Sequence, residues 1–333
     1  MASKRLANGL TRSALTIALG LCFAGAVQAQ SSVGSVFGHA SANSTVTIHS
    51  VATGTTRTIT SDASGNYSFS SLSPGRYTVT SDGVTREILV KIGTGSQVDF
   101  VGSGGQAVDL GTITVIGSAA INPIDVSSVE STSVFTSEQI EQLPVASNIT
   151  AVALLAPGTV KGDSGFGNLA SFGGSSVAEN GYYINGFDVT NMRNMLSFAD
   201  VPFQAIAQQQ VKTGGYGAEY GRSLGGVISL LTKSGTNEWR FGGSVEWSPE
   251  WGRESGKDVK QQDPDSANPL YVYRSDNTSQ STIYSAYASG PIIKDRLFFF
   301  ALVEGRDSSS DTYGSLTSLS AEDNSPQAMT KLD

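Results

Sequence analysis

The stretch GYGAEYGRSLGG, residues 215–226, decides the fold; it runs directly into VISLLTKSGTNEW, residues 227–239. Five of its twelve residues are glycine, and Glu219 stands three positions before Arg222. Glycine lets a backbone approach another surface closely, because no Cβ keeps the two apart. We therefore predict that this segment, at the entrance to an apolar strand, packs tightly and is held in part by its two charges.

Residues 239–247, WRFGGSVEW, alternate strictly between apolar and polar positions, with Trp239 and Trp247 at the two ends. Such a strand has one lipid face and one wet face, as in a transmembrane β-barrel. We predict two further strands, STIYSAYAS at 281–289 and LFFFALVE at 297–304, joined by a short turn after a long connection. The last strand is apolar on both faces, so the pattern leaves its lipid side open.

Upstream of these strands, residues 123–237 are predicted to form a compact α/β module. The pattern indicates a strand at 127–136, a short helix starting at Ser137, and a second helix capped by Ser147 or Asn148. Asn185-Gly186 is expected to form a hairpin turn. Two more strands are expected, at the end of 201–214 and within 225–235.

The first β-rich region, residues 31–102, is predicted to be a β-sandwich. Tyr67 and Phe69 share one face of a strand, and a turn at Pro74-Gly75 is expected to bring them opposite Tyr77 and Val79. The region resembles the carboxypeptidase regulatory-like domain, which implies a non-catalytic accessory module. The residues that match its pattern are Asp62, Gly65, Tyr67, Phe69, Leu72, Pro74, Gly75, Tyr77 and Val79.

Composition argues against several function classes. The net charge of -8 disfavours nucleic-acid binding, and two histidines in 333 residues are too few for a three-histidine metal site. We therefore expect no enzymatic activity, no metal and no cofactor. Residues 1–29 are predicted to be an export signal cleaved after Ala29, and they contain the single cysteine, Cys22.

The opening stretch resembles the end of the plug domain of TonB-dependent outer-membrane receptors, in the Oar-like branch. The residues that carry the resemblance are Gly214 or Gly215, Ala218, Glu219, Tyr220, Gly221, Arg222, Gly225, Gly226, Val227, Thr232, Lys233, Ser234, Gly235, Thr236 and Asn237. It implies plug–barrel contacts by Glu219, Gly221, Arg222, Gly225, Gly226 and Lys233. The alternative for the two charged residues at 219 and 222 is an ordinary turn with a local ion pair.

The same resemblance implies a TonB-contacting strand in the linker, residues 103–122. Its residues are Thr112, Ile113, Thr114, Val115, Ile116 and Gly117. In the family this strand adds to the TonB C-terminal domain, which the ExbB/ExbD complex energises with the proton gradient, and strand addition tolerates variable side chains. A plain linker strand is the alternative.

The implied function is import of an external ligand across the outer membrane, with the N-terminal domain in the periplasm. Tyr182, Tyr183, Asn191 and Arg193 are candidate ligand contacts, although core packing explains the tyrosines equally well. The sequence does not identify the ligand. The rival hypothesis is a surface adhesion or scaffold protein that does not depend on TonB.

The predicted fold class is therefore mixed β and α/β: an N-terminal β-sandwich, an α/β plug domain at 123–237, and the first strands of a truncated antiparallel transmembrane β-barrel at 238–333. Residues 238–333 allow about three strands, and an open sheet cannot sit in lipid. We expect this part to form an unclosed sheet.

Overall fold

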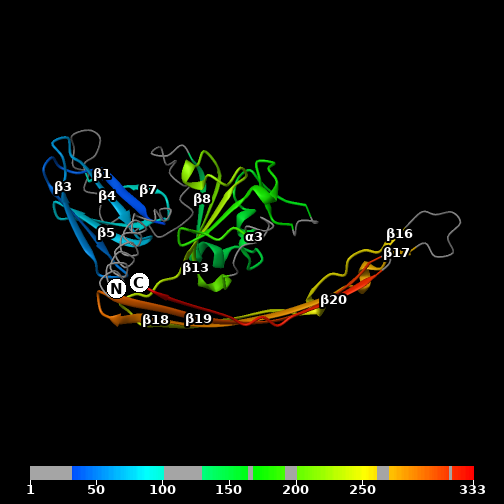
Figure 1. Cartoon of the computed structure of the whole chain (residues 1–333). Helices are drawn as coiled ribbons and strands as arrows, with labels where there is room; N and C mark the ends of the chain where they lie inside the picture. Colours follow the sequence, from blue (N-terminus) through cyan, green and yellow to red (C-terminus); the bar gives the residue numbers. More distant parts are fainter. Residues whose placement is uncertain (1–31, 101–129, 164–167, 192–200, 261–269, 315–316) are drawn as a thin grey trace, which may run out of the picture.

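The computed structural model describes residues 32–100, 130–163, 168–191, 201–260, 270–314 and 317–333. Three units follow one another along the chain, and Figure 1 shows the first two lying side by side above one face of a long C-terminal sheet. The predicted export signal, the strand at 112–117 and Arg193 lie outside the described residues.

The first unit, residues 32–100, is a sandwich of two sheets. One sheet has the order β4-β1-β7 and the other β3-β2-β5-β6, and the two enclose a single core with Phe69, Val79 and Val36 fully buried. The strands are β1 (Gly34–His39), β2 (Thr45–Ser50), β3 (Thr56–Thr60), β4 (Asn66–Leu72), β5 (Gly75–Ser81), β6 (Val84–Val90) and β7 (Gly95–Gln97). The predicted β-sandwich is confirmed.

The turn at Pro74-Gly75 corrects one prediction within this unit. Strand β4 pairs with β1, whereas β5 pairs with β2 and β6, so the turn carries the chain from one sheet to the other. Tyr67 and Tyr77 therefore enter the same core from different sheets and are not neighbours in one hairpin. The alternation of apolar and polar residues identified the buried face of each strand, but it could not show which strands pair.

The second unit, residues 130–237 and called here the α/β module, is built on a five-stranded sheet with the order β12-β11-β14-β13-β8. Its strands and helices are β8 (Ser131–Thr136), α2 (Ser137–Gln142), α3 (Ile149–Ala153), β9 (Thr159–Lys161), β10 (Ala170–Phe172), η2 (Val177–Glu179), β11 (Gly181–Ile184), β12 (Phe187–Asp188), η3 (Phe203–Ala205), β13 (Ile206–Gly214), η4 (Ala218–Tyr220) and β14 (Val227–Thr232).

Local signals place most of these elements where they were predicted. Thr136 caps α2 through a reciprocal pair with Gln139, and Asn148 caps α3. Asn185 and Gly186 both have positive φ and join β11 to β12, as a two-residue hairpin requires. The second helix is short and ends at Ala153. None of the helices in the described part of the chain is long and apolar enough to cross a membrane.

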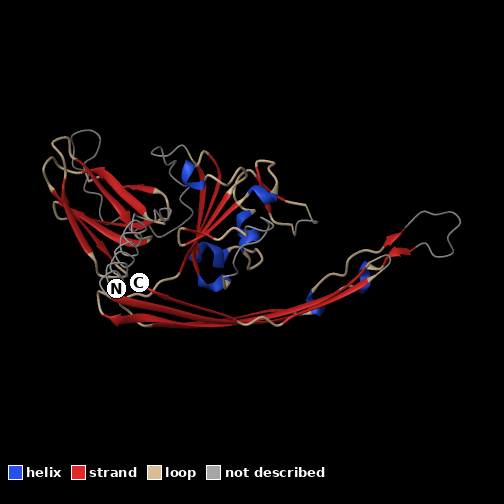
Figure 2. Cartoon of the chain, viewed as in Figure 1, coloured by secondary structure: helices blue, strands red, loops and turns tan. Residues whose placement is uncertain are grey.

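The third unit is the C-terminal sheet, with the strand order β15-β18-β19-β20 and β21 also paired to β19. Its elements are β15 (Arg240–Ser248), η5 (Glu250–Gly252), β16 (Val259–Lys260), β17 (Leu270–Val272), η6 (Arg274–Asp276), β18 (Thr278–Ile293), β19 (Leu297–Tyr313), β20 (Ser318–Asp323) and β21 (Gln327–Leu332). Figure 2 shows these strands as a long curved band, and the sheet is unclosed, as predicted.

The strands of this sheet are longer than predicted. Strand β18 continues to Ile293, so the turn that follows covers only residues 294–296, and β19 continues to Tyr313. Strands β20 and β21 pair with successive halves of β19 and together form an interrupted fourth strand that the sequence pattern did not reveal.

The packing assigns the two faces of β19. Phe298, Phe300 and Leu302 are buried, and the last two form a cluster with Ala205 of the α/β module. The intervening residues share the opposite face with Phe241 and Val245, through the registers Ala288–Ala301 and Tyr284–Gly305. The apolar outer face is therefore the one that includes Val303, which is exposed.

Candidate functional site

The glycine segment, residues 215–226, is fastened inside the α/β module. The amides of Leu224 and Gly225 both donate to the carbonyl oxygen of Glu179 at 3.0 Å. The amide of Gly226 donates to Oδ1 of Asn180 at 3.2 Å, and Nδ2 of Asn180 donates to the carbonyl of Ala170 at 2.7 Å. These bonds close the entrance to β14 against η2 and β10.

Gly225 and Gly226 are glycines because of this internal packing. A Cβ on Gly226 would lie 2.3 Å from the Cγ of Phe172, and a Cβ on Gly225 would lie 2.7 Å from Oδ1 of Asn180. Both neighbours belong to the α/β module and are buried. The close approach predicted from the glycines is present, but the partner is the module's own core and not a barrel wall.

An aromatic cluster supports the same end of the module. The ring of Tyr220 packs edge-on against Tyr183 at 5.2 Å and Tyr216 at 5.9 Å, and Nζ of Lys212 lies 4.9 Å from its centroid. Lys212 also forms an ion pair with Glu130. Burial raises the pKa of Tyr220 above its ordinary value of 10, with the negative charge of Glu219 acting in the same direction. Tyr220 is therefore a neutral packing residue at physiological pH.

Glu219, Gly221 and Arg222 lie on the exposed side of this cluster. They stand before β14, whereas the contacts with the C-terminal sheet lie at the other end of that strand, where Ala205 is hydrogen-bonded to Lys233. The strand is about 20 Å long. The described strands of the sheet therefore give no support to the predicted wall contacts of these residues, and such contacts stay predictions.

The junction segment, defined here as Lys233–Asn237, carries polar contacts between the α/β module and the C-terminal sheet, beside the apolar cluster of Ala205. Nζ of Lys331 donates to Oγ of Ser234 at 2.7 Å, and Nδ2 of Asn237 donates to Oδ1 of Asp295 at 2.8 Å. A Cβ on Gly235 would lie 2.4 Å from the carbonyl oxygen of Phe299, so here the backbone of one unit touches the backbone of the other. The predicted wall contacts did not include Gly235.

Lys233 is the one predicted contact residue that lies at this junction. Its Nζ is 5.8 Å from the ring centroid of Tyr287 in β18 and 4.0 Å from Oε1 of Glu141. Burial lowers the pKa of Lys233 below its ordinary value of 10.5, while the charges of Glu141 and Glu138 oppose the shift. The lysine thus links α2, β14 and the sheet with a charge that is only partly hydrated.

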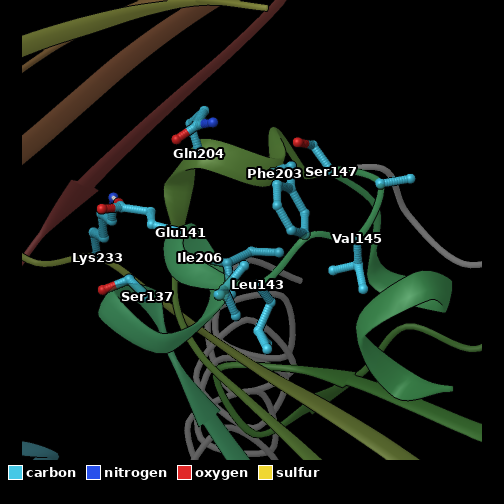
Figure 3. Close-up of a pocket in the computed structure, with 11 residues that line it drawn as sticks. Ser137, Glu141, Leu143, Val145, Ser147, Phe203, Gln204, Ile206 and Lys233 are labelled. Carbon is cyan, nitrogen blue, oxygen red and sulfur yellow. Dashed lines mark ion pairs between the residues drawn. The ribbon is translucent and has the colours of Figure 1, made fainter. Parts of the chain in front are cut away.

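A small cavity opens beside Lys233, between α2 and η3. Its volume is about 200 Å³, and Figure 3 shows Lys233 and Glu141 next to each other at one edge while Phe203, Ile206 and Leu143 form the apolar side. The cavity contains one lysine and one carboxylate that already face each other. Among the described residues there is no cluster of three or more His, Cys, Asp or Glu that could hold a metal.

The candidate ligand contacts take different positions. Tyr182 and Tyr183 are 2% and 3% exposed and belong to two core clusters of the α/β module, so in this structure they are packing residues. Asn191 follows β12 at intermediate exposure. Contact of either tyrosine with an external ligand would require the module to open.

The sequence reasoning missed most of the junction. Ser234, Gly235 and Asn237 were recognised as part of the motif but were not assigned a contact, because the motif does not say which glycine faces which partner. The available signal was position: residues between the last strand of a module and the first strand of a sheet must lie where the two meet.

Comparison with known proteins identifies two domains. Residues 125–227 match the TonB-dependent receptor plug domain, and residues 32–101 match the carboxypeptidase regulatory-like domain. The TonB-dependent transporter Oar of Myxococcus xanthus is 27% identical over 327 residues, covering 88% of this chain and 28% of Oar. The chain thus spans just over a quarter of the length of this curated relative.

Two solved structures are similar to part of this chain. The outer membrane transporter YddB from Escherichia coli has a TM-score of 0.44 and 18% identity, covering 61% of this chain and 30% of its own. The siderophore receptor PirA from Pseudomonas aeruginosa has a TM-score of 0.35 and 14% identity, covering 61% of this chain and 34% of its own. On the domain matches, the chain carries a carboxypeptidase regulatory-like domain followed by the plug domain of a TonB-dependent receptor.

Proposed function

We propose that this chain is the plug-bearing part of an outer-membrane transporter that binds an external ligand and imports it when TonB pulls on the plug. The α/β module is the plug, the C-terminal sheet is part of the barrel wall, and the sandwich lies in the periplasm. The observation that carries the proposal is the chemistry of the C-terminal sheet, which has an apolar outer face and a plug packed on its inner face.

The outer face has the composition of a lipid-facing surface. Phe241, Val245 and Trp247 are 69%, 74% and 62% exposed in β15. Trp239 stacks on Phe241 at one end, and Trp247 packs against Trp251 at the other. Trp239 and Trp247 are eight residues apart, about 26 Å along a strand. Aromatic girdles flank an apolar band about 25 Å tall in outer-membrane barrels.

The inner face combines polar wall positions with a limited contact to the plug. Ser244 and Ser285 hydrogen-bond across β15 and β18 at 2.8 Å, and Glu304 lies 3.8 Å from Arg306. The plug touches this face through the Ala205 cluster and the junction segment. A small apolar cluster and single polar bonds suit a plug that must be displaced and returned.

In this proposal, residues 112–117 are the segment that TonB binds and pulls. They stand between the sandwich and the plug, and strand addition to the TonB C-terminal domain would let tension reach the plug through its first strand, β8. Strand β8 is the edge strand of the plug sheet and pairs only with β13 among the described strands. An edge strand can be peeled away one hydrogen-bonded pair at a time.

Binding of purified TonB C-terminal domain to the full-length protein in detergent tests the proposal. We expect measurable binding, lost when residues 112–117 are replaced by a glycine-serine sequence. The matched control replaces residues 103–106 of the same linker and should bind normally. Equal binding of all three proteins, or no binding at all, would contradict the TonB assignment and favour an adhesion or scaffold protein.

A further inference from the structure

Strand β13 presents alternate glutamines to opposite sides of the plug sheet. Gln208, Gln209 and Gln210 are all buried. Nε2 of Gln209 donates to the carbonyl of Ile149 at 2.8 Å, toward α3. The side chains on either side of it point to the opposite face, since successive residues of a strand alternate. That face of β13 is polar and is covered by the sandwich.

The contact is made with one residue of the sandwich. The amide of Ile92 donates to Oε1 of Gln208 at 2.9 Å, and Nε2 of Gln210 donates to the carbonyl of Ile92 at 3.0 Å. The two glutamines thus satisfy both backbone groups of one residue, as a neighbouring strand would. Ile92 is 1% exposed although it is not part of the sandwich core cluster. Its amide and its carbonyl are therefore both paired with the plug.

We propose that the carboxypeptidase regulatory-like domain is a docked clamp on the plug, held by recognition of the Ile92 backbone by Gln208 and Gln210. The sandwich and the plug then behave as one body in the resting state. The proposal concerns contacts within the chain and does not depend on ligand import or on TonB.

A second contact is made by a neighbouring loop at the same end of the sandwich, since the ends of β2 and β6 both lie beside the start of β5. The amide of Asn237 in the junction segment donates to the carbonyl of Ala52 at 3.0 Å. A Cβ on Gly54, which has a φ of 74°, would lie 2.8 Å from Oδ1 of Asp295. The loop around Ala52 therefore sits where the plug meets the C-terminal sheet. Two separate contacts resist rotation in a way that a single contact could not.

The three units leave a gap beside these contacts. A cavity of about 740 Å³ is lined by residues of all three units, among them Arg57, Lys233 and Arg240. The gap shows that the three units do not pack tightly on one another at this point. The buried hydrogen bonds to Ile92 are therefore the contacts to remove, and their removal should release the sandwich without unfolding it.

Hydrogen exchange of the full chain, read at single amides, tests the clamp. In Gln208→Leu/Gln210→Leu the Ile92 amide should exchange at least about tenfold faster, because its buried acceptor is gone. The Gly93 amide donates to the carbonyl of Val33 inside the sandwich at 3.0 Å and should not change. Gln209→Leu is the matched control, since this glutamine faces α3, and it should leave Ile92 protected.

A distance measurement keeps the test independent of the exchange data. Spin labels at Val84 of the sandwich and Val160 of the plug, both exposed, should give one narrow distance in the parent protein and in Gln209→Leu. The distribution should broaden in Gln208→Leu/Gln210→Leu. An unchanged Ile92 amide and distance in the double variant, or the same change in Gln209→Leu, would overturn the proposal.

Discussion

Each end of strand β14 is flanked by a glycine that has no room for a Cβ, but the neighbouring atoms belong to different units at the two ends. At its start, a Cβ on Gly226 would lie 2.3 Å from the ring of Phe172 inside the plug. Past its end, a Cβ on Gly235 would lie 2.4 Å from the backbone of Phe299 in the C-terminal sheet. One glycine allows the plug to close on itself, and the other allows the plug to touch the wall.

This difference separates the stability of the plug from its attachment. The first end is surrounded by buried hydrogen bonds from Asn180 and by the tyrosine cluster, so it can open only if the plug unfolds. The second end contacts the sheet through single polar bonds such as that between Ser234 and Lys331. Force applied to the plug should therefore break the second end first.

Gly226→Ala should give the largest effect, because the new methyl group has no space. Phe172 is 2% exposed and packed on all sides, so it cannot move away. We expect a loss of roughly 3 kcal/mol in the free energy of unfolding of the plug, at the upper end for overpacking. Urea unfolding combined with hydrogen exchange of the β14 amides measures it.

Gly214→Ala is the matched control for this variant. No atom lies within 4 Å of a Cβ at that position, and its φ is not positive, so stability should change by less than about 0.5 kcal/mol. Equal stability of the two variants would remove the distinction between the ends of β14.

Gly235→Ala should have a smaller effect of a different kind. The added methyl group meets the backbone of another unit, so the strain can be relieved by separating the plug from β19. We expect a loss of about 1 to 2 kcal/mol, confined to contacts at the junction, with β14 still protected from exchange. Hydrogen exchange near Phe299 should rise, and a loss of protection throughout the plug would contradict the assignment of Gly235 to the wall contact.

Much of this architecture could be predicted from local signals. Strict alternation from Trp239 to Trp247 predicts β15, and Asn185-Gly186 predicts the hairpin, because each signal concerns neighbours in sequence. The partners of a residue are set by the tertiary fold, and here prediction failed. The Pro74-Gly75 turn joins two sheets, and the glycines at 225 and 226 face the plug core.

Strand β19 shows the same limit most clearly. Phe298 to Val303 are all apolar, so period-two alternation contains no information about which side faces the plug. Only the position of Ala205 opposite Phe300 and Leu302 decides it. The clamp contact was also invisible, because Gln208 and Gln210 read as ordinary polar residues of a strand until Ile92 is seen between them.

The smallest effect concerns the charge at the wall end of β14. Burial lowers the pKa of Lys233 from 10.5, so on raising the pH the folded protein releases this proton before the unfolded chain does. Between the two pKa values the unfolded state binds more protons, and the free energy of unfolding therefore rises with pH there. Below the folded pKa the contribution of Lys233 to the free energy of unfolding is constant.

Lys233→Met removes this titration. The free energy of unfolding of the parent, relative to that of the variant, should rise with pH by less than about 1 kcal/mol up to pH 10.5. Glu141→Gln sharpens the measurement, since Glu141 opposes the shift and its loss should start the rise at lower pH. Urea unfolding at intervals from pH 7.5 to 10.5 measures all three proteins, and parallel profiles of the parent and Lys233→Met would show that the lysine charge is fully hydrated and not enclosed at the junction.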